Sequence, residues 1–153
     1  EKVTAEHGCV VSYIHGGGRI GVIVEADTDV VNEAVKECLS NVAMQVAALA
    51  PKYVATADVP EEYKEHEKEI LKPANIIEKM ISGRLAKELK EVCLLEQAYV
   101  KDGDLTVAKY VEQVAKENGA ALSIKKFVRF ETGEGLEKKV DDFAAEVAAQ
   151  AGL

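Results

Sequence analysis

The stretch "YIHGGGRIGVIVE" (residues 13–25) decides the fold. Its glycines at 16, 18 and 21 spell G-x-G-x-x-G, the pattern of a dinucleotide-binding loop. Such a loop must open a helix, because the helix N-terminus holds the phosphates. Here Val22-Ile-Val24 follows the glycines, and β-branched residues of this kind favour a strand. The stretch therefore predicts a hairpin turn in which glycines adopt positive φ angles.

Strands and a long helix are expected around this turn. The segments 8–15 and 19–26 are rich in β-forming apolar residues and predict two antiparallel strands. Asp27-Thr28-Asp29 offers helix N-caps, and residues 28–31 are interpreted as the cap of a helix that ends before Pro51. This helix of about five turns would bury an apolar stripe at helical spacing, formed by Val31, Val35, Cys38, Val42, Val46 and Leu49.

A helical hairpin is expected at about 56–92. Pro60 opens "PEEYKEHEKEILK" (60–72), which is helical in pattern but almost entirely polar, so it cannot be buried on all sides. Pro73 breaks this helix. A second helix then runs to about Lys90, with an apolar stripe of Ile76, Ile77, Met80, Ile81, Leu85 and Leu89. The pair should project from the core as an antiparallel hairpin.

The last third of the chain returns to the core. Residues 94–104 predict a loop or short strand that ends in a turn at Asp102-Gly103. Thr106 caps the next helix and Gly119 closes it, residues 122–131 form a third strand, and a last helix covers 136–150. The fold class is α+β, with a small antiparallel sheet of about three strands and helices packed on one face.

Composition excludes several functions. A net charge of −8 argues against nucleic-acid binding, which needs a basic face. The three cysteines show no metal-ligand spacing and are expected to be buried reduced thiols in a cytoplasmic protein. No apolar run approaches the roughly 20 residues of a membrane span. Because the sequence starts at Glu1 rather than Met, we expect it to be part of a longer chain.

No catalytic constellation is visible, so the chain is expected to be no enzyme and to need no cofactor or metal. His15 and Arg19 remain at the tip of the hairpin. A histidine beside a turn is usually just exposed, and a partner contact is the alternative.

Several ordered segments resemble the elongation factor Ts family, and together they cover nearly the whole chain. They are "YIHGGGRIGVIVE" (13–25), "NVAMQVAALAPKYV" (41–54), "VP" (59–60) with "EKEI" (67–70), "IIEKMISGR" (76–84), "LLEQAYVKD" (94–102) and "FVRFETGEGLEKKVDDFAAEVAAQ" (127–150). The resemblance is to the family's C-terminal core, or dimerisation, domain over 1–153. It implies a hairpin insertion at about 56–92 and a C-terminal helical module at about 136–153.

The resemblance implies a non-covalent function: promoting GDP/GTP exchange on elongation factor Tu by stabilising its nucleotide-free state. It also implies a homodimer contact through the helical hairpin. The expected partner-binding residues are His15, Gly16, Gly17, Arg19, Tyr99, Val100, Lys101 and Phe143. Val100 has a simpler interpretation as a core strand residue, and Phe143 has one as part of a packing stripe with Val140 and Val147.

Two departures from the family pattern limit the expected function. Thr28-Asp29-Val30-Val31 is similar to a Thr-Asp-Phe-Val signature of the family's first core half, but Val30 replaces the Phe that displaces nucleotide. We therefore expect docking without strong exchange. Near Lys72-Pro73 the family usually has more residues, which leaves the function of the hairpin tip open. The rival functions are a self-association module built on the hairpin and, from another class, a nucleotide-binding enzyme.

Overall fold

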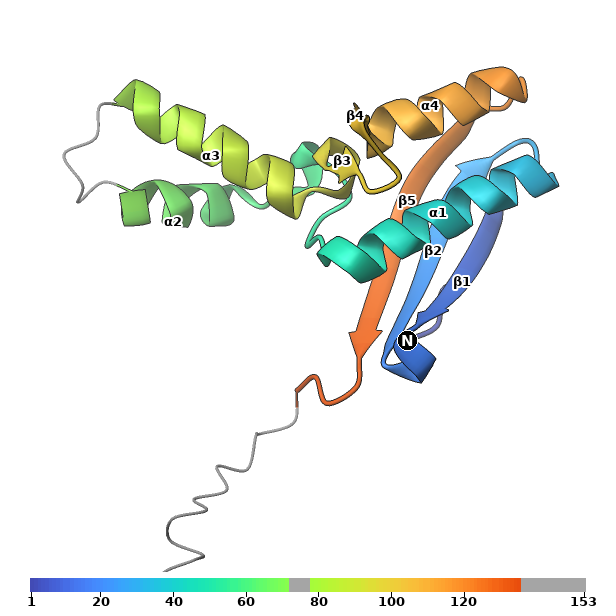
Figure 1. Cartoon of the computed structure of the whole chain (residues 1–153). Coiled ribbons are helices and arrows are strands. Elements are labelled where there is room, and N and C mark those ends of the chain that lie inside the picture. The colour runs from blue at the N-terminus through green and yellow to red at the C-terminus, as the bar shows by residue number, and fades with distance from the viewer. Residues whose placement is uncertain (72–77, 136–153) are drawn as a thin grey trace, which may run out of the picture.

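The computed structural model describes residues 1–71 and 78–135, and its main element is a three-stranded antiparallel sheet (Figure 1). β1 (Cys9–His15) pairs with β2 (Ile20–Thr28), and β2 pairs with β5 (Leu122–Glu131), in the order β1-β2-β5. The predicted hairpin and third strand are confirmed. The G-x-G-x-x-G pattern thus lies in a connection between strands, without the helix that a dinucleotide loop needs.

One face of this sheet is covered by α1 (Glu33–Leu49). Alternate strand residues point toward α1, and the register sets Val11 opposite Val24 and Tyr13 opposite Val22. The core between sheet and helix contains four predicted stripe residues, Val35, Cys38, Val42 and Val46, each at most 1% exposed. The ends of the predicted stripe are wrong, because Val31 and Leu49 are 49% and 48% exposed.

The start of α1 also differs from the prediction of a cap at 28–31. Thr28 is the last residue of β2, where it pairs with Leu122, so the strand runs further than expected. The N-cap is Asn32, whose Oδ1 accepts the N–H of Val35 at 2.9 Å. Its Nδ2 donates to Asn118 Oδ1 at 3.0 Å and so links the start of α1 to the residue that follows α4 (Val107–Glu117). Strand pairing outweighed the local capping preference of Asp27-Thr28-Asp29.

α4 (Val107–Glu117) packs against α1 and β5 and begins and ends as predicted. Thr106 is its N-cap and accepts the N–H of Lys109 at 3.3 Å. Gly119, at φ +59°, follows the helix, and the N–H of Ala120 reaches back to the carbonyl of Ala115 at 2.9 Å. This is the geometry that favours glycine just beyond a helix C-terminus.

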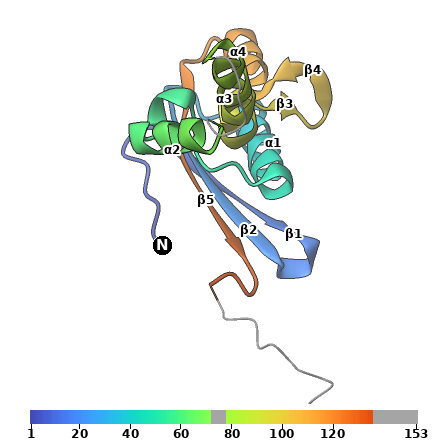
Figure 2. The ribbon, with the colours of Figure 1, turned by 90° about the vertical axis from the view of Figure 1, so that its left-hand side faces the viewer.

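The predicted helical hairpin is present as α2 (Glu61–Leu71) and α3 (Glu78–Val92), which extend side by side from one end of the molecule (Figures 1 and 2). Its base has a small core of its own, in which Val59, Val92 and Cys93 are buried beneath Tyr53 and Tyr63. The predicted break at Pro73 and the predicted helix at 136–150, with Phe143, lie outside the described residues.

The segment between α3 and α4 forms a second, two-stranded sheet. A 3₁₀ turn, η4 (Leu94–Glu96), leads into β3 (Ala98–Tyr99), which pairs with β4 (Asp102–Thr106). The turn falls at Val100 and Lys101, so the predicted turn at Asp102-Gly103 is wrong. Asp102 instead pairs with Tyr99 as the first residue of β4.

Candidate functional site

The β1–β2 turn is built from glycine backbone. The short turn η1 (Gly16–Gly18) has φ angles of +60°, +65° and +96° along its three residues. A Cβ built at Gly17 or Gly18 would meet nothing within 4 Å, so backbone conformation rather than crowding requires glycine here. The N–H of Arg19 closes the turn on the carbonyl of Gly16 at 3.4 Å.

His15 and Arg19 flank this turn. The side chain of His15 is exposed, and its Nδ1 lies 3.0 Å from the hydroxyl of Tyr13, with the two rings 5.9 Å apart. Thr132, just beyond β5, holds the Arg19 side of the turn, because its N–H donates to the carbonyl of Arg19 at 2.8 Å. The imidazole is therefore placed at the end of a strand and is open to a partner.

The β3–β4 turn carries the second group of predicted residues. Val100 is 45% exposed, which rules out its interpretation as a core strand residue. Lys101 is exposed, but its Nζ donates to Asn41 Oδ1 on α1 at 2.7 Å. Tyr99 is 4% exposed and stacks on Tyr110 of α4, with centroids 4.2 Å apart and planes at 12°. Tyr99 therefore supports the turn from beneath, while Val100 and Lys101 form its surface.

A buried glutamine of α1 fixes the backbone of this turn. Gln45 is fully buried, and its Oε1 accepts the N–H of Val100 at 2.8 Å. Its Nε2 donates to the carbonyl of Ala98 at 2.9 Å and to Gln97 Oε1 at 3.2 Å. Gln97 in turn donates to the carbonyl of Glu91 in α3 at 2.7 Å. The side chains of Gln45 and Gln97 thus hold the chain that leads into the turn.

The groups beneath the turn are held neutral. Burial raises the pKa of the Cys38 thiol to about 11 and raises the pKa of both Tyr99 and Tyr110 above the usual range of phenols. The hydroxyl of Tyr110 accepts from Asn41 Nδ2 at 2.8 Å. Among these tied residues the ammonium of Lys101 is the charge presented at the surface.

The two turns lie on the same side of the molecule. In Figure 2 both turns lie on the right-hand side of the molecule, the β3–β4 turn in its upper part and the β1–β2 turn in its lower part. α1 lies between them. The β1–β2 turn carries His15, Gly16, Gly17 and Arg19, and the β3–β4 turn carries Val100 and Lys101, with Tyr99 buried beside them. Phe143 lies outside the described residues.

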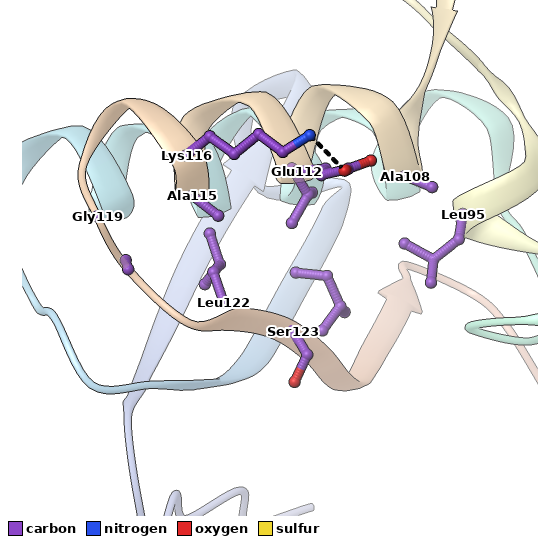
Figure 3. A pocket seen from close by; sticks show the side chains of 11 residues that line it. Leu95, Ala108, Glu112, Ala115, Lys116, Gly119, Leu122 and Ser123 are labelled. Carbon is purple, nitrogen blue, oxygen red and sulfur yellow. Dashed lines mark ion pairs between the residues drawn. The ribbon is translucent and has the colours of Figure 1, made fainter.

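A groove of about 460 Å³ lies elsewhere, between α4 and the start of β5 (Figure 3). Its walls are mostly aliphatic, with Leu95, Ala115 and Leu122 among them. Its two charged residues, Glu112 and Lys116, pair with each other at 2.7 Å. The groove is therefore an apolar surface feature, and none of the residues that line it belongs to the β1–β2 turn.

Within residues 1–71 and 78–135, no group of three or more His, Cys, Asp or Glu side chains is placed to hold a metal ion. None of the helices in these ranges combines the length and hydrophobicity of a membrane span. Cys38 and Cys93 are buried free thiols, as predicted, whereas Cys9 is only half-buried.

Fold and site together define a small α+β domain with two braced turns on one side. Residues 1–134 match the protein family described as Elongation factor TS. The chain belongs to the elongation factor Ts family. It is 53% identical to elongation factor Ts of Clostridioides difficile (strain 630), with 94% of this chain and 50% of that protein covered. It is 51% identical to that of Carboxydothermus hydrogenoformans, with 95% and 72% covered.

A third relative, from Clostridium botulinum (strain Eklund 17B / Type B), is 49% identical, with 99% of this chain and 52% of the relative covered. The chain therefore spans about half the length of the two clostridial relatives.

Sequence reasoning missed two residues that shape the site, Gln45 and Asn41. Both occur in "NVAMQVAALA" (41–50), and both are buried although they are polar. An amide at a buried position of an otherwise apolar helix needs a partner, which was the available signal. The partners themselves are more than 50 residues away and could not be read locally.

Proposed function

We propose that this chain supplies a docking surface for elongation factor Tu in a factor that promotes GDP/GTP exchange. Membership of the elongation factor Ts family supports the reaction and the partner. The observation that carries the proposal is that His15 and Val100 are both accessible and both belong to braced turns, and that these turns lie on the same side of the molecule (Figure 2).

The physical basis is binding at a few anchors. Interface energy concentrates in a small number of well-placed side chains rather than in total area. Val100 supplies an apolar anchor and His15 a ring that can stack or donate a hydrogen bond, while Arg19 and Lys101 add positive charge. Gly16 and Gly17 lack side chains, so a partner can approach the backbone of the turn closely.

Exchange follows from linkage between two ligands of the same GTPase. A factor that prefers the nucleotide-free form must weaken GDP binding by the same factor by which GDP weakens its own binding. No bond is made or broken in this process, so the chain needs no nucleophile or general base. Phe143 remains a predicted contact of the C-terminal module.

Docking is tested by Val100→Ala and His15→Ala in this chain. Each should weaken binding to nucleotide-free elongation factor Tu by about 1–2 kcal/mol, roughly 5- to 30-fold, in calorimetric titration. Val10→Ala is the matched control, since Val10 is 38% exposed on β1 but at the opposite end of the strand from His15. Equal binding by all three variants and the unaltered chain would refute the proposed surface.

We also propose that docking by this chain alone gives little exchange. The motivation is Val30, which stands where the family signature has Phe, in the turn that joins β2 to α1. Release of fluorescent GDP from elongation factor Tu should be accelerated far less by this chain than by a full-length relative at equal occupancy. Full acceleration by the chain alone would contradict this part of the proposal.

Self-association through α2 and α3 is a second candidate function. Ile70 and Met80 support it, because they are 57% and 52% exposed on the hairpin. Light scattering should then give a dimer that Ile70→Gln with Met80→Gln converts to a monomer, with binding to elongation factor Tu unchanged. A monomer at every concentration would remove this candidate.

A further inference from the structure

We propose that Gln45 is a positioning residue for docking: its buried amide holds the β3–β4 turn in the conformation that presents Val100. This inference rests on the proposed function, since it concerns how one of its anchors is displayed. Gln45 itself is fully buried and cannot touch a partner. Any effect on binding must act through the turn.

The amide contacts three points of the chain leading into the turn. Oε1 accepts from the N–H of Val100 at 2.8 Å, and Nε2 donates to the carbonyl of Ala98 at 2.9 Å and to Gln97 Oε1 at 3.2 Å. Both ends of one planar group are therefore used. The backbone on each side of Tyr99 is tied to a helix that is itself fixed in the core.

The strands alone constrain this turn weakly. β3 has only two residues, and its register with β4 shifts between Ala98 and Tyr99. The only Cα partners in this pair are Ala98 with Thr106 and Tyr99 with Asp102. A two-stranded ribbon of this length has little stability of its own. The Gln45 amide supplies what the strand pairing lacks.

Loss of the amide should open the turn. Gln45→Met keeps a similar length and volume but leaves the N–H of Val100 and the carbonyl of Ala98 without their partners. Because unpaired buried backbone groups are costly, these groups would turn toward water. The fraction of molecules with Val100 in its docking position then falls, and the apparent affinity falls in proportion.

The first experiment follows the turn without a partner. Amide exchange of the 153-residue chain should show protection of the Val100 N–H, and Gln45→Met should abolish it while exchange at Val24 in the sheet stays slow. Unchanged protection at Val100 in the variant would overturn the inference, since the turn would then not depend on the amide.

The second experiment measures binding to nucleotide-free elongation factor Tu in a cycle with Val100→Ala. Gln45→Met alone should weaken binding about tenfold, as for a turn competent in about a tenth of molecules. In the Val100→Ala background the same change should have no more than about a twofold effect, because the anchor that it positions is already absent. Equal effects in both backgrounds would indicate general destabilisation and would overturn the inference.

Val35→Ala serves as the control for general destabilisation. Val35 is fully buried at the opposite end of α1 and contributes no hydrogen bond to the turn. At a temperature where both variants are folded, it should leave the affinity within about twofold despite a lowered Tm. If the unaltered chain fails to bind at all, the proposed function fails as well. If it binds and Gln45→Met binds equally well, only the present inference fails.

Discussion

The two turns that display the predicted contact residues are stabilised in different ways. The β1–β2 turn depends on its own backbone, with three consecutive glycines at positive φ. The β3–β4 turn itself has no glycine, and the nearby Gly103 does not have a positive φ. This turn depends instead on side chains from α1 and α4. The first is specified locally, whereas the second exists only when distant parts of the chain have packed.

This difference predicts how each turn responds to substitution. A substitution within the glycine turn acts through backbone strain and should destabilise the turn itself. A change beneath the second turn acts through lost hydrogen bonds or packing and should couple to residues far away in the sequence. Four experiments compare the two, in decreasing order of expected effect.

The largest effect is expected from replacing Gly16, Gly17 and Gly18 together by alanine. Each would force a Cβ into a left-handed conformation that costs about 1–2 kcal/mol, so the free energy of unfolding should fall by about 3 kcal/mol or more. Urea denaturation followed by circular dichroism measures this. The control is Gly21→Ala, where φ is not positive and a Cβ meets nothing within 4 Å. A comparable loss at Gly21 would contradict the strain argument.

Asn41→Ala should have the next largest effect. Asn41 is 9% exposed, donates to Tyr110 and accepts from Lys101. Its loss leaves the Tyr110 hydroxyl without its donor, while the exposed Lys101 can turn to water, so the loss of stability should be about 1–2 kcal/mol. Ser40→Ala, one position earlier and only half-buried, should change stability by less than about 0.5 kcal/mol. Thermal unfolding of both variants tests the difference.

The same contrast explains what could be predicted from sequence. The hairpin, strand β5 and the caps Thr106 and Gly119 were predicted, because each depends on residues close together in the chain. The cap at 27–29 was wrong because β2 gains pairing with Leu122, which no local pattern reveals. The exposure of Val100 and the role of Gln45 likewise depend on contacts across 55 residues.

A third experiment isolates the stacked rings of Tyr99 and Tyr110. A double-mutant cycle with Tyr99→Leu and Tyr110→Leu should give a coupling energy of about 1 kcal/mol, as for aromatic pairs in offset contact. The matched comparison is Tyr13 with His15, whose rings are 5.9 Å apart and tilted, with Tyr13 half-buried and His15 exposed, and whose coupling should be smaller. Equal coupling in the two pairs would show that burial beneath the second turn adds nothing.

The smallest effect concerns alkaline pH and acts through Cys38, a core residue that also lies among the groups supporting the second turn. In the folded chain burial raises the pKa of Cys38 from 9.0 to about 11, so the unfolded chain loses this proton first as the pH rises. Stability is therefore complete below about pH 9 and declines between pH 9 and about 11, by less than about 1 kcal/mol at pH 9.5. Urea unfolding at pH 8.0 and 9.5 should show this decline, and Cys38→Ala should reduce it.

A second measurement is amide hydrogen exchange over the same pH range. After correction for intrinsic rates, exchange at the Val100 N–H should rise more than exchange at the Val24 N–H in the sheet, because Cys38 lies beside Tyr110, which supports the second turn. An identical pH dependence with and without the thiol would show that the network beneath the turn is insensitive to this ionisation.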